Sequence, residues 1–154
     1  QYFERCEYDV KYESFDGIND DIINDNLHLT LNLLQRNFDM TILYESNDPE
    51  IDHIFPKSIL KEKGVDDYYI NFYANYWYLP KNQNRNKSNK HPKEFFKDIG
   101  ITDAKLEKLY INSKMLNFHR YKTFIGERGN KIKNYISNSL EIQECDYKDE
   151  AVEV

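Results

Sequence analysis

The sequence predicts an α+β domain in which short strands lie among several helices. Apolar residues recur at helical spacing over two segments, from about Ile18 to Leu34 and from Phe118 to Leu140. Short β-prone segments, rich in aromatic and β-branched residues, stand between them. With 154 residues, 40% of them apolar, the chain has the length of one domain and can bury a core. We therefore interpret residues 1–154 as a single domain, and because the chain begins at Gln1 we expect a fragment of a longer protein.

The first predicted helix runs from about Ile18 to Leu34, and either Asp16 or Asn19 is placed to cap its start. A β-prone run follows at Met40 to Tyr44. The Ser46 to Pro49 segment has the composition of a turn. The N-terminal third is therefore expected to contain one amphipathic helix and one short strand.

The middle of the chain alternates short elements. A strand is predicted from Ile51 to Ile54 and stops at Pro56. Ser58 to Lys63 has the pattern of a helical turn that Gly64 closes. The aromatic run from Phe72 to Leu79 is predicted to form a further strand.

The C-terminal part is predicted to be helical over residues 102–140. Pro92 suits the first turn of a helix that runs to about Ile99, since proline has no N–H to leave unpaired. A short helix follows from Asp103 to Tyr110, with Thr102 as its cap, and the longest helix covers Phe118 to Leu140. We expect the acidic tail at residues 141–154 to be frayed.

No apolar run approaches the roughly 20 residues that span a bilayer, so no membrane partner is expected. No leader resembles a signal peptide, which favours a cytoplasmic location. Cys6 and Cys145 form no CxxC pair, which argues against a structural zinc site. Two reduced thiols are the preferred interpretation of these cysteines, and a disulfide between the ends of the chain is the alternative.

Charge is distributed unevenly along the chain, although the net charge of −6 alone argues against a nucleic-acid partner. Residues 1–52 carry 3 basic and 13 acidic side chains, and residues 141–154 carry 1 basic and 6 acidic ones. Residues 53–140 carry 17 basic and 8 acidic side chains, a net charge of +9. This asymmetry is compatible with a polyanionic partner, and solvated faces of mixed sign are the alternative.

The Asp52-His53 pair lies near the end of the strand predicted from Ile51 to Ile54. An imidazole with an ordinary pKa of about 6.5 can take a proton from water near neutral pH. Neighbouring side chains on a strand point to opposite faces, so where the strand ends Asp52 can bind a metal ion while His53 faces the attacking water. The alternative interpretation of His53 is a structural histidine.

Two asparagines complete the candidate site. Asn75 falls within the predicted aromatic strand, and Asn84 follows nine residues later in a polar segment. Hard divalent cations accept carboxylate and amide oxygens, and they keep several waters when the protein supplies only two ligands. Asp52 and Asn84 would supply such a pair. Asparagine is frequent in this part of the chain, so the residue type alone does not identify a ligand.

The segment from Lys81 to Lys90 is almost entirely Lys, Arg, Asn, Gln and Ser, and it has nothing apolar to bury. The cations around Asn84 are Lys81, Arg85, Lys87, Lys90, Lys93 and Lys97. Ammonium and guanidinium groups bind phosphates, and the release of counterions drives affinity that is independent of sequence. The segment is therefore a candidate nucleic-acid-binding surface, with a solvated basic loop as the alternative.

The order and spacing of these residues resemble the HNH nuclease superfamily, in which a two-stranded hairpin and a following helix clamp one metal ion. Glu50 to Ser58 (EIDHIFPKS) resembles the first strand with its Asp-His pair, and Ala74 to Asn89 resembles the second strand, turn and helix start. In the HNH domain of RNA-guided CRISPR nucleases, an Asn on the second strand is likewise followed nine residues later by the metal-binding Asn, within an N-R-x-K-S run. The resemblance implies a ββα-metal core, with its motif over residues 50–97, embedded in a mostly helical domain.

Within the superfamily, the chain is most similar to the C-terminal HNH domains of the DUF262/DUF1524 group, whose members include restriction enzymes directed at modified phage DNA. These domains share a DHIFP…N…N..KS…P run. They often end in an F-x-x-F-x-x-x-R helix, which the Phe118-to-Arg128 region resembles. The likeness implies a role in prokaryotic antiviral defence. It also implies an N-terminal regulatory domain that precedes this chain.

The resemblance implies a role for each residue of the motif. His53 would deprotonate the attacking water, and Asp52 and Asn84 would bind one Mg²⁺ or Mn²⁺ ion. Asn75 would brace the hairpin and help to hold His53. The residues expected to contact nucleic acid are Lys81, Arg85, Lys87 and Lys90. Many members place a histidine at the last metal position, where this chain has Asn84.

The sequence therefore predicts a metal-dependent endonuclease that hydrolyses DNA, with RNA as an alternative substrate. Two other classes of protein compete with this interpretation. One is a catalytically silent nucleic-acid-binding module that uses the same ββα element. The other is a helical interaction domain in which the motif arose by chance. The enzyme is favoured because both the base and the expected metal ligands are present.

Overall fold

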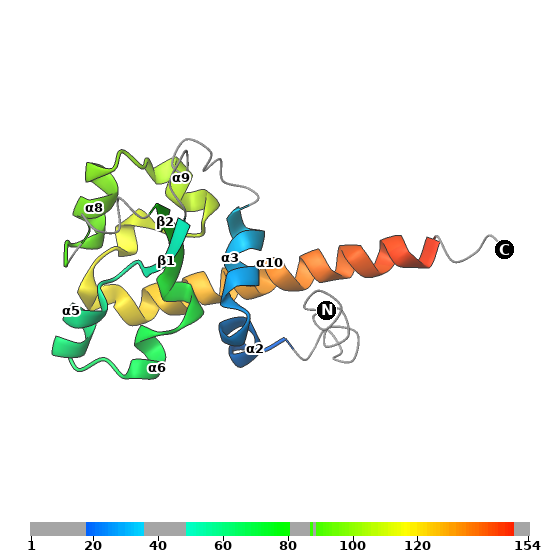
Figure 1. The fold of residues 1–154 in the computed structure, drawn as a ribbon, viewed down its shortest axis with the longest axis horizontal. Coiled ribbons are helices and arrows are strands. Elements are labelled where there is room, and N and C mark those ends of the chain that lie inside the picture. Colours follow the sequence, from blue (N-terminus) through cyan, green and yellow to red (C-terminus); the bar gives the residue numbers. More distant parts are fainter. Residues whose placement is uncertain (1–17, 36–48, 81–86, 88, 150–154) are drawn as a thin grey trace.

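The structure is a computed structural model, and it describes residues 18–35, 49–80, 87 and 89–149. Within these residues, short helices surround one two-stranded antiparallel sheet, and a long C-terminal helix crosses the whole assembly (Figure 1). This arrangement confirms the predicted α+β class. None of the described helices is long and apolar enough to cross a membrane.

The sheet pairs β1 (Pro49–His53) with β2 (Tyr76–Pro80). In this register Asp52 lies opposite Trp77, and His53, the last residue of β1, lies opposite Tyr76, the first residue of β2. The two strands predicted here, at Ile51 to Ile54 and within Phe72 to Leu79, are confirmed. The second strand begins later than predicted, because Tyr73–Asn75 forms a 3₁₀ turn, η2, in front of it.

The connection between the strands folds into two short helices, α5 (Lys57–Glu62) and α6 (Asp67–Ile70). The first was predicted from its composition, and Gly64 closes it with a positive φ of 74°. The second was not predicted. Its N-cap is Asp66, whose carboxylate accepts a hydrogen bond of 2.8 Å from the Tyr68 N–H. The connection ends at Asn71, beside the end of β1.

The predicted N-terminal helix is divided into α2 (Asp20–Asp25) and α3 (Leu27–Gln35). The prediction of one continuous helix was wrong, because Asn26 leaves the helical conformation with φ −112° and ψ 39°. The Asn26 side-chain amide donates to the Ile22 carbonyl at 2.8 Å and so competes with the helical backbone. The predicted cap is confirmed, since the Asn19 side chain accepts from the Ile22 N–H at 3.0 Å. The strand predicted at residues 40–44 lies outside the described residues.

After β2, the C-terminal part of the chain forms a series of helices. They are α8 (Pro92–Asp98), α9 (Asp103–Lys108), η3 (Ser113–Met115), η4 (Phe118–Arg120) and α10 (Tyr121–Asp149). The helices expected after Pro92 and after Thr102 are confirmed, and the Thr102 hydroxyl accepts from the Lys105 N–H as the predicted cap. The backbone of α10 is helical to Asp149, past Leu140 where the helix was expected to end, and it extends beyond the other described elements (Figure 1). The fraying expected from Glu141 stays a prediction.

The first half of α10 positions the strand ends of the sheet. Arg128 is 2% exposed, and its guanidinium donates to the carbonyls of Ala74 at 2.6 Å, Tyr76 at 2.9 Å and Leu109 at 3.1 Å. Two of these carbonyls flank Asn75 in the turn before β2. Phe55, which follows β1, packs its ring against aromatic side chains at the start of the same helix and just before it. The residues after β1 and those before β2 are thus held against one helix.

Candidate active site

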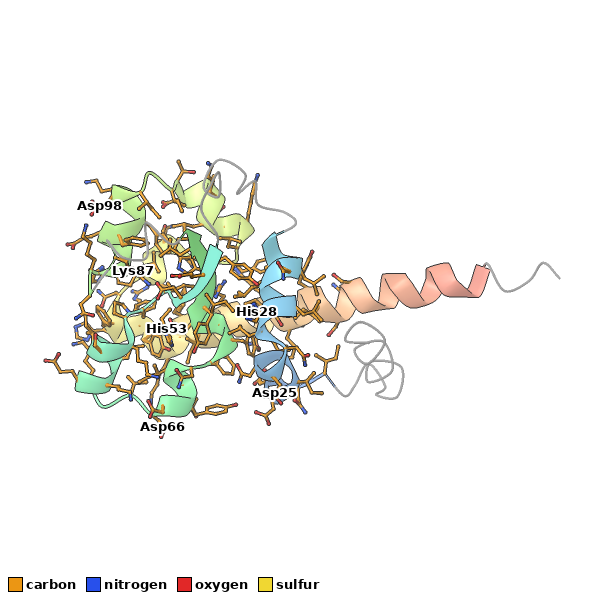
Figure 2. The ribbon with its side chains drawn as sticks, viewed as in Figure 1. Asp25, His28, His53, Asp66, Lys87 and Asp98 are labelled. Carbon is orange, nitrogen blue, oxygen red and sulfur yellow. The ribbon has the colours of Figure 1, made fainter. Side chains whose placement is uncertain are left out.

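The site is built around the last two residues of β1, because the strand ends there and both side chains remain partly exposed. Asp52 points toward a buried lysine, Lys87, and His53 points toward Asn71 at the end of α6. Side chains of neighbouring residues on a strand point to opposite faces of the sheet. Asp52 and His53 therefore lie in two different environments although they are adjacent in the sequence. Figure 2 shows His53 and Lys87 in the same region of the molecule.

Lys87 lies in the interior of the protein, with an exposed fraction of 3%. Its ammonium contacts the Asp52 carboxylate at Oδ2 and the backbone carbonyl of His53. It also lies 5.6 Å from the centre of the Phe95 ring. Burial lowers the pKa of the Lys87 ammonium, and the Asp52 charge opposes this shift. A carboxylate, a carbonyl and an aromatic face therefore compensate for the loss of water around a buried cation.

The place of Lys87 differs from the sequence-based expectation. Residues 81–90 were expected to have nothing to bury, and Lys87 was expected to reach DNA phosphates from a solvated surface. Instead, its aliphatic stem lies in the core and its charge is used inside the protein. Lys90, by contrast, is exposed and forms an ion pair with Asp98 at 2.8 Å. Of Lys87 and Lys90, only Lys90 carries a charge that solvent can reach.

His53 is partly buried beside β2, with its ring centre 4.4 Å from that of Tyr76. Its Nε2 atom lies 3.3 Å from the side-chain oxygen of Asn71. Burial lowers the pKa of His53, which the hydrogen bond to Asn71 and the Asp52 charge oppose, while Lys87 and Lys57 lower it further. The net effect places the pKa of His53 below its ordinary value of 6.5. The imidazole is therefore neutral at neutral pH, the form in which it can accept a proton.

Asn71 was not predicted as a site residue. Its side-chain oxygen lies 3.2 Å from the Tyr76 hydroxyl and 3.4 Å from the Lys57 ammonium, as well as close to His53. The surrounding sequence offers no signal for this role, since the contact depends on how α6 returns the chain to the end of β1. Lys57 was missed for a different reason, because it stands in a short helix with an ordinary composition.

Asn75 is fully buried in the turn before β2 and not on the strand, where it was expected. Its side-chain oxygen accepts from the Phe55 N–H at 2.9 Å, and its amide donates to the carbonyls of Ile70 at 3.0 Å and Phe55 at 3.4 Å. Its backbone carbonyl accepts from the Ile54 N–H at 2.6 Å. Through these contacts, Asn75 connects two parts of the chain: the segment after His53 and the C-terminal end of α6, where Asn71 lies.

The remaining predicted residues are Asn84, Lys81 and Arg85, and all three lie outside the described residues. The structure therefore brings together Asp52, His53, Asn75 and Lys87 from the predicted set. Two other histidines have structural contacts. His91 caps α8, with Nδ1 3.3 Å from the Lys93 N–H, and His28 lies 3.1 Å from the Tyr78 hydroxyl.

Asp52 supplies one oxygen donor of the kind that a hard divalent cation accepts. Asp52 is 20% exposed at its side chain, and among the described residues only Lys87 contacts its carboxylate, through Oδ2. No three His, Cys, Asp or Glu side chains of the described part gather to hold a metal ion. A site built from one carboxylate and one amide oxygen does not need such a cluster, since water completes the coordination of a hard cation.

Comparisons with family models, with curated proteins and with solved structures find no match to this chain. The functional interpretation therefore depends on the chemistry of the site and on the resemblance of its motif.

Proposed function

We propose that this chain is a metal-dependent endonuclease of the HNH type that hydrolyses phosphodiester bonds of DNA. The observation that supports this most is the combination at the end of β1: a histidine whose pKa is lowered, next to a carboxylate that solvent can reach. A neutral imidazole and an adjacent oxygen ligand are what metal-assisted hydrolysis of a phosphodiester requires. The antiparallel pairing of β1 with β2 supports the proposal of a ββα-metal core, since such a core contains a two-stranded hairpin.

In the proposed reaction, His53 takes one proton from a water molecule. The water oxygen forms a bond to phosphorus while the bond from phosphorus to the 3′ oxygen breaks. The leaving oxygen takes a proton from solvent, so the products carry a 5′-phosphate and a 3′-hydroxyl group. Lys57 lies near the Asn71 oxygen that also contacts His53, so its exposed ammonium is placed to attract the phosphate.

Asp52 and Asn84 are the residues that would hold a Mg²⁺ or Mn²⁺ ion. When bound, the ion would stabilise negative charge on the phosphate and on the leaving oxygen. Lys87 contacts Oδ2 of Asp52 and the His53 carbonyl, so it fixes the carboxylate relative to the strand end. A nucleic acid is proposed as the substrate because residues 53–140 carry a net charge of +9, and DNA is proposed on the resemblance of the motif. A role in prokaryotic antiviral defence is proposed on the resemblance of the motif alone.

A second candidate is a nucleic-acid-binding module without activity, and one observation favours it. The Lys87 ammonium already neutralises Asp52 from inside the protein, so the carboxylate is satisfied with no metal ion. In that case the strand end would be a structural ion pair beneath a basic surface. The two candidates differ in whether His53 acts on a substrate.

Cleavage of supercoiled plasmid with Mg²⁺, with Mn²⁺ and with a chelator separates the two candidates. The enzyme is expected to nick or linearise the plasmid only when a divalent ion is present. The matched control is His119→Ala, which removes an exposed imidazole from a different part of the chain and is expected to cleave like wild type. DNA binding without cleavage by wild type, under all metal conditions, would support the binding module instead.

A further inference from the structure

We propose that Asn71 is a positioning residue that holds His53 in the tautomer with its proton on Nε2, which leaves Nδ1 as the atom that accepts the proton from water. The functional part of this inference rests on the proposed nuclease activity. The structural part concerns the hydrogen bonding of one imidazole and does not depend on any substrate.

The inference begins with three groups that surround one atom. The Asn71 side-chain oxygen lies 3.3 Å from His53 Nε2, 3.2 Å from the Tyr76 hydroxyl and 3.4 Å from the Lys57 ammonium. An ammonium group has protons to donate and no lone pair to accept with. The Asn71 atom that faces Lys57 is therefore the carbonyl oxygen, since the amide NH₂ in that place would meet a second donor.

The identity of this atom decides the tautomer of His53. A carbonyl oxygen only accepts, so His53 Nε2 must carry the proton that it donates to Asn71. A neutral imidazole has one N–H, and Nδ1 then keeps its lone pair. The ring plane is fixed as well, because the Tyr76 ring packs against it at 4.4 Å while the Tyr76 hydroxyl contacts the same Asn71 oxygen.

Asn71 itself is held from both sides by the fold. Its backbone N–H donates to the Asp67 carbonyl at 3.0 Å, at the C-terminal end of α6. Ile70 before it is buried, and its carbonyl accepts from the Asn75 side chain at 3.0 Å. Phe72 after it is also buried. The Asn71 side chain is exposed, so a substitution there changes the contact with His53 without removing a core residue.

This geometry gives Asn75 and Asn71 different tasks. Asn75 is fully buried, and through the Ile70 carbonyl and the Phe55 backbone it links α6 to the segment after β1. Asn71 uses the position set in this way to orient the imidazole. A base whose lone pair is fixed toward the reacting water loses less entropy on reaching the transition state than one that rotates or exchanges tautomers.

The first test reads the tautomer directly, by long-range proton–nitrogen NMR of the His53 ring in the intact chain, at a pH where the imidazole is neutral. Wild type is expected to show the proton on Nε2. Asn71→Leu removes the acceptor and is expected to give a mixture of tautomers, whereas Asn71→Asp keeps an oxygen acceptor and the Nε2 proton. Tyr76→Phe is the matched control, since it removes a donor but leaves the acceptor, and the tautomer should not change.

The second test uses plasmid cleavage by the same variants at saturating DNA. Asn71→Leu is expected to lower kcat by about 10-fold or more with little change in KM, a part of the ~10²–10⁴-fold that general-base catalysis contributes. Asn71→Asp is expected to recover most of the loss. A proton on Nδ1 in wild type, or a tautomer that Asn71→Leu leaves unchanged, would overturn the inference. If wild type does not cleave DNA at all, the proposed function fails, while the NMR result still decides the tautomer.

Discussion

The most informative perturbation of the fold is Arg128→Met, because this buried side chain joins three segments of the chain. The substitution keeps much of the aliphatic volume and removes the hydrogen bonds to the carbonyls of Ala74, Tyr76 and Leu109. Burial lowers the pKa of the Arg128 guanidinium to about 9, so the group is still charged at neutral pH and its hydrogen bonds are charge-assisted. The loss is therefore larger than that of three neutral bonds.

The expected loss follows from the groups left behind. A buried carbonyl without a partner costs about 1–3 kcal/mol, and relief from burying a charge offsets part of the sum. We expect Arg128→Met to lower the free energy of unfolding by about 3–5 kcal/mol. For a chain of this length that corresponds to a fall in Tm of about 6–20 °C. Ala74 and Tyr76 flank Asn75, so the environment of His53 should also be disturbed.

Urea unfolding monitored by Trp77 fluorescence and by circular dichroism measures this loss. The matched control is Lys131→Met, which removes an exposed cation three residues further along the same helix and should change stability by less than about 0.5 kcal/mol. A loss below about 1 kcal/mol for Arg128→Met would refute the reasoning, since it would mean that the three carbonyls are satisfied without the guanidinium.

Substitutions at the candidate site give further tests. His53→Ala is expected to lower cleavage by about 10²–10⁴-fold with folding and metal binding retained, as a cleavage assay, melting and a metal titration will show; parallel loss of folding would identify a structural histidine. Because the pKa of His53 lies below 6.5, its neutral form predominates at neutral pH, and cleavage should fall with acidification through a midpoint below 6.5. As the pH falls below 6.5, the His53 imidazole takes up a proton in the unfolded chain before it does so in the folded protein, so the free energy of unfolding decreases. A pH series of melting curves on wild type and His53→Gln measures this contribution. Lys87→Met should cost about 1–3 kcal/mol of stability because it leaves Asp52 without its cation; Lys90→Met, which breaks an exposed pair, should cost less than about 1 kcal/mol in the same unfolding assay. Asp52→Asn should weaken Mn²⁺ binding in a calorimetric titration, and unchanged affinity would exclude Asp52 as a ligand.

Much of the fold follows from local sequence signals. Asn19, Thr102 and Pro92 mark the starts of helices because their side chains satisfy or remove N–H groups that the first turn leaves unpaired. Proline and glycine mark the ends of several elements for equally local reasons. The division at Asn26 was missed since apolar spacing continues across it, and only the hydrogen bond from its side chain to Ile22 distinguishes a break from a helix.

The candidate site was only partly predictable from the sequence. Spacing identifies residues that are neighbours on one strand, but it does not identify contacts between residues that are far apart in the sequence. Asp52 and His53 are adjacent, so their proximity needs no fold. Asn71 approaches His53 only because α6, which has four residues, turns the chain back to the start of β2. Lys87 was assigned to a solvated surface since its neighbours are polar, yet the depth of a long side chain is set by the cavity that it enters.

Burial of the ring is the main cause of the lowered pKa of His53, and the charge of the buried Lys87 adds to it. A carboxylate beside an imidazole ordinarily stabilises the protonated ring. Taken by itself, the Asp52 charge raises the pKa of His53. Lys87 neutralises that carboxylate from the interior, and both Lys87 and Lys57 act on His53 in the opposite direction. Burial then outweighs the remaining attraction, so His53 stays neutral without any cation from solvent. The Lys87 ammonium contacts both the Asp52 carboxylate and the backbone carbonyl of His53. Its position there is the reason to interpret Asp52, His53 and Lys87 as one functional unit.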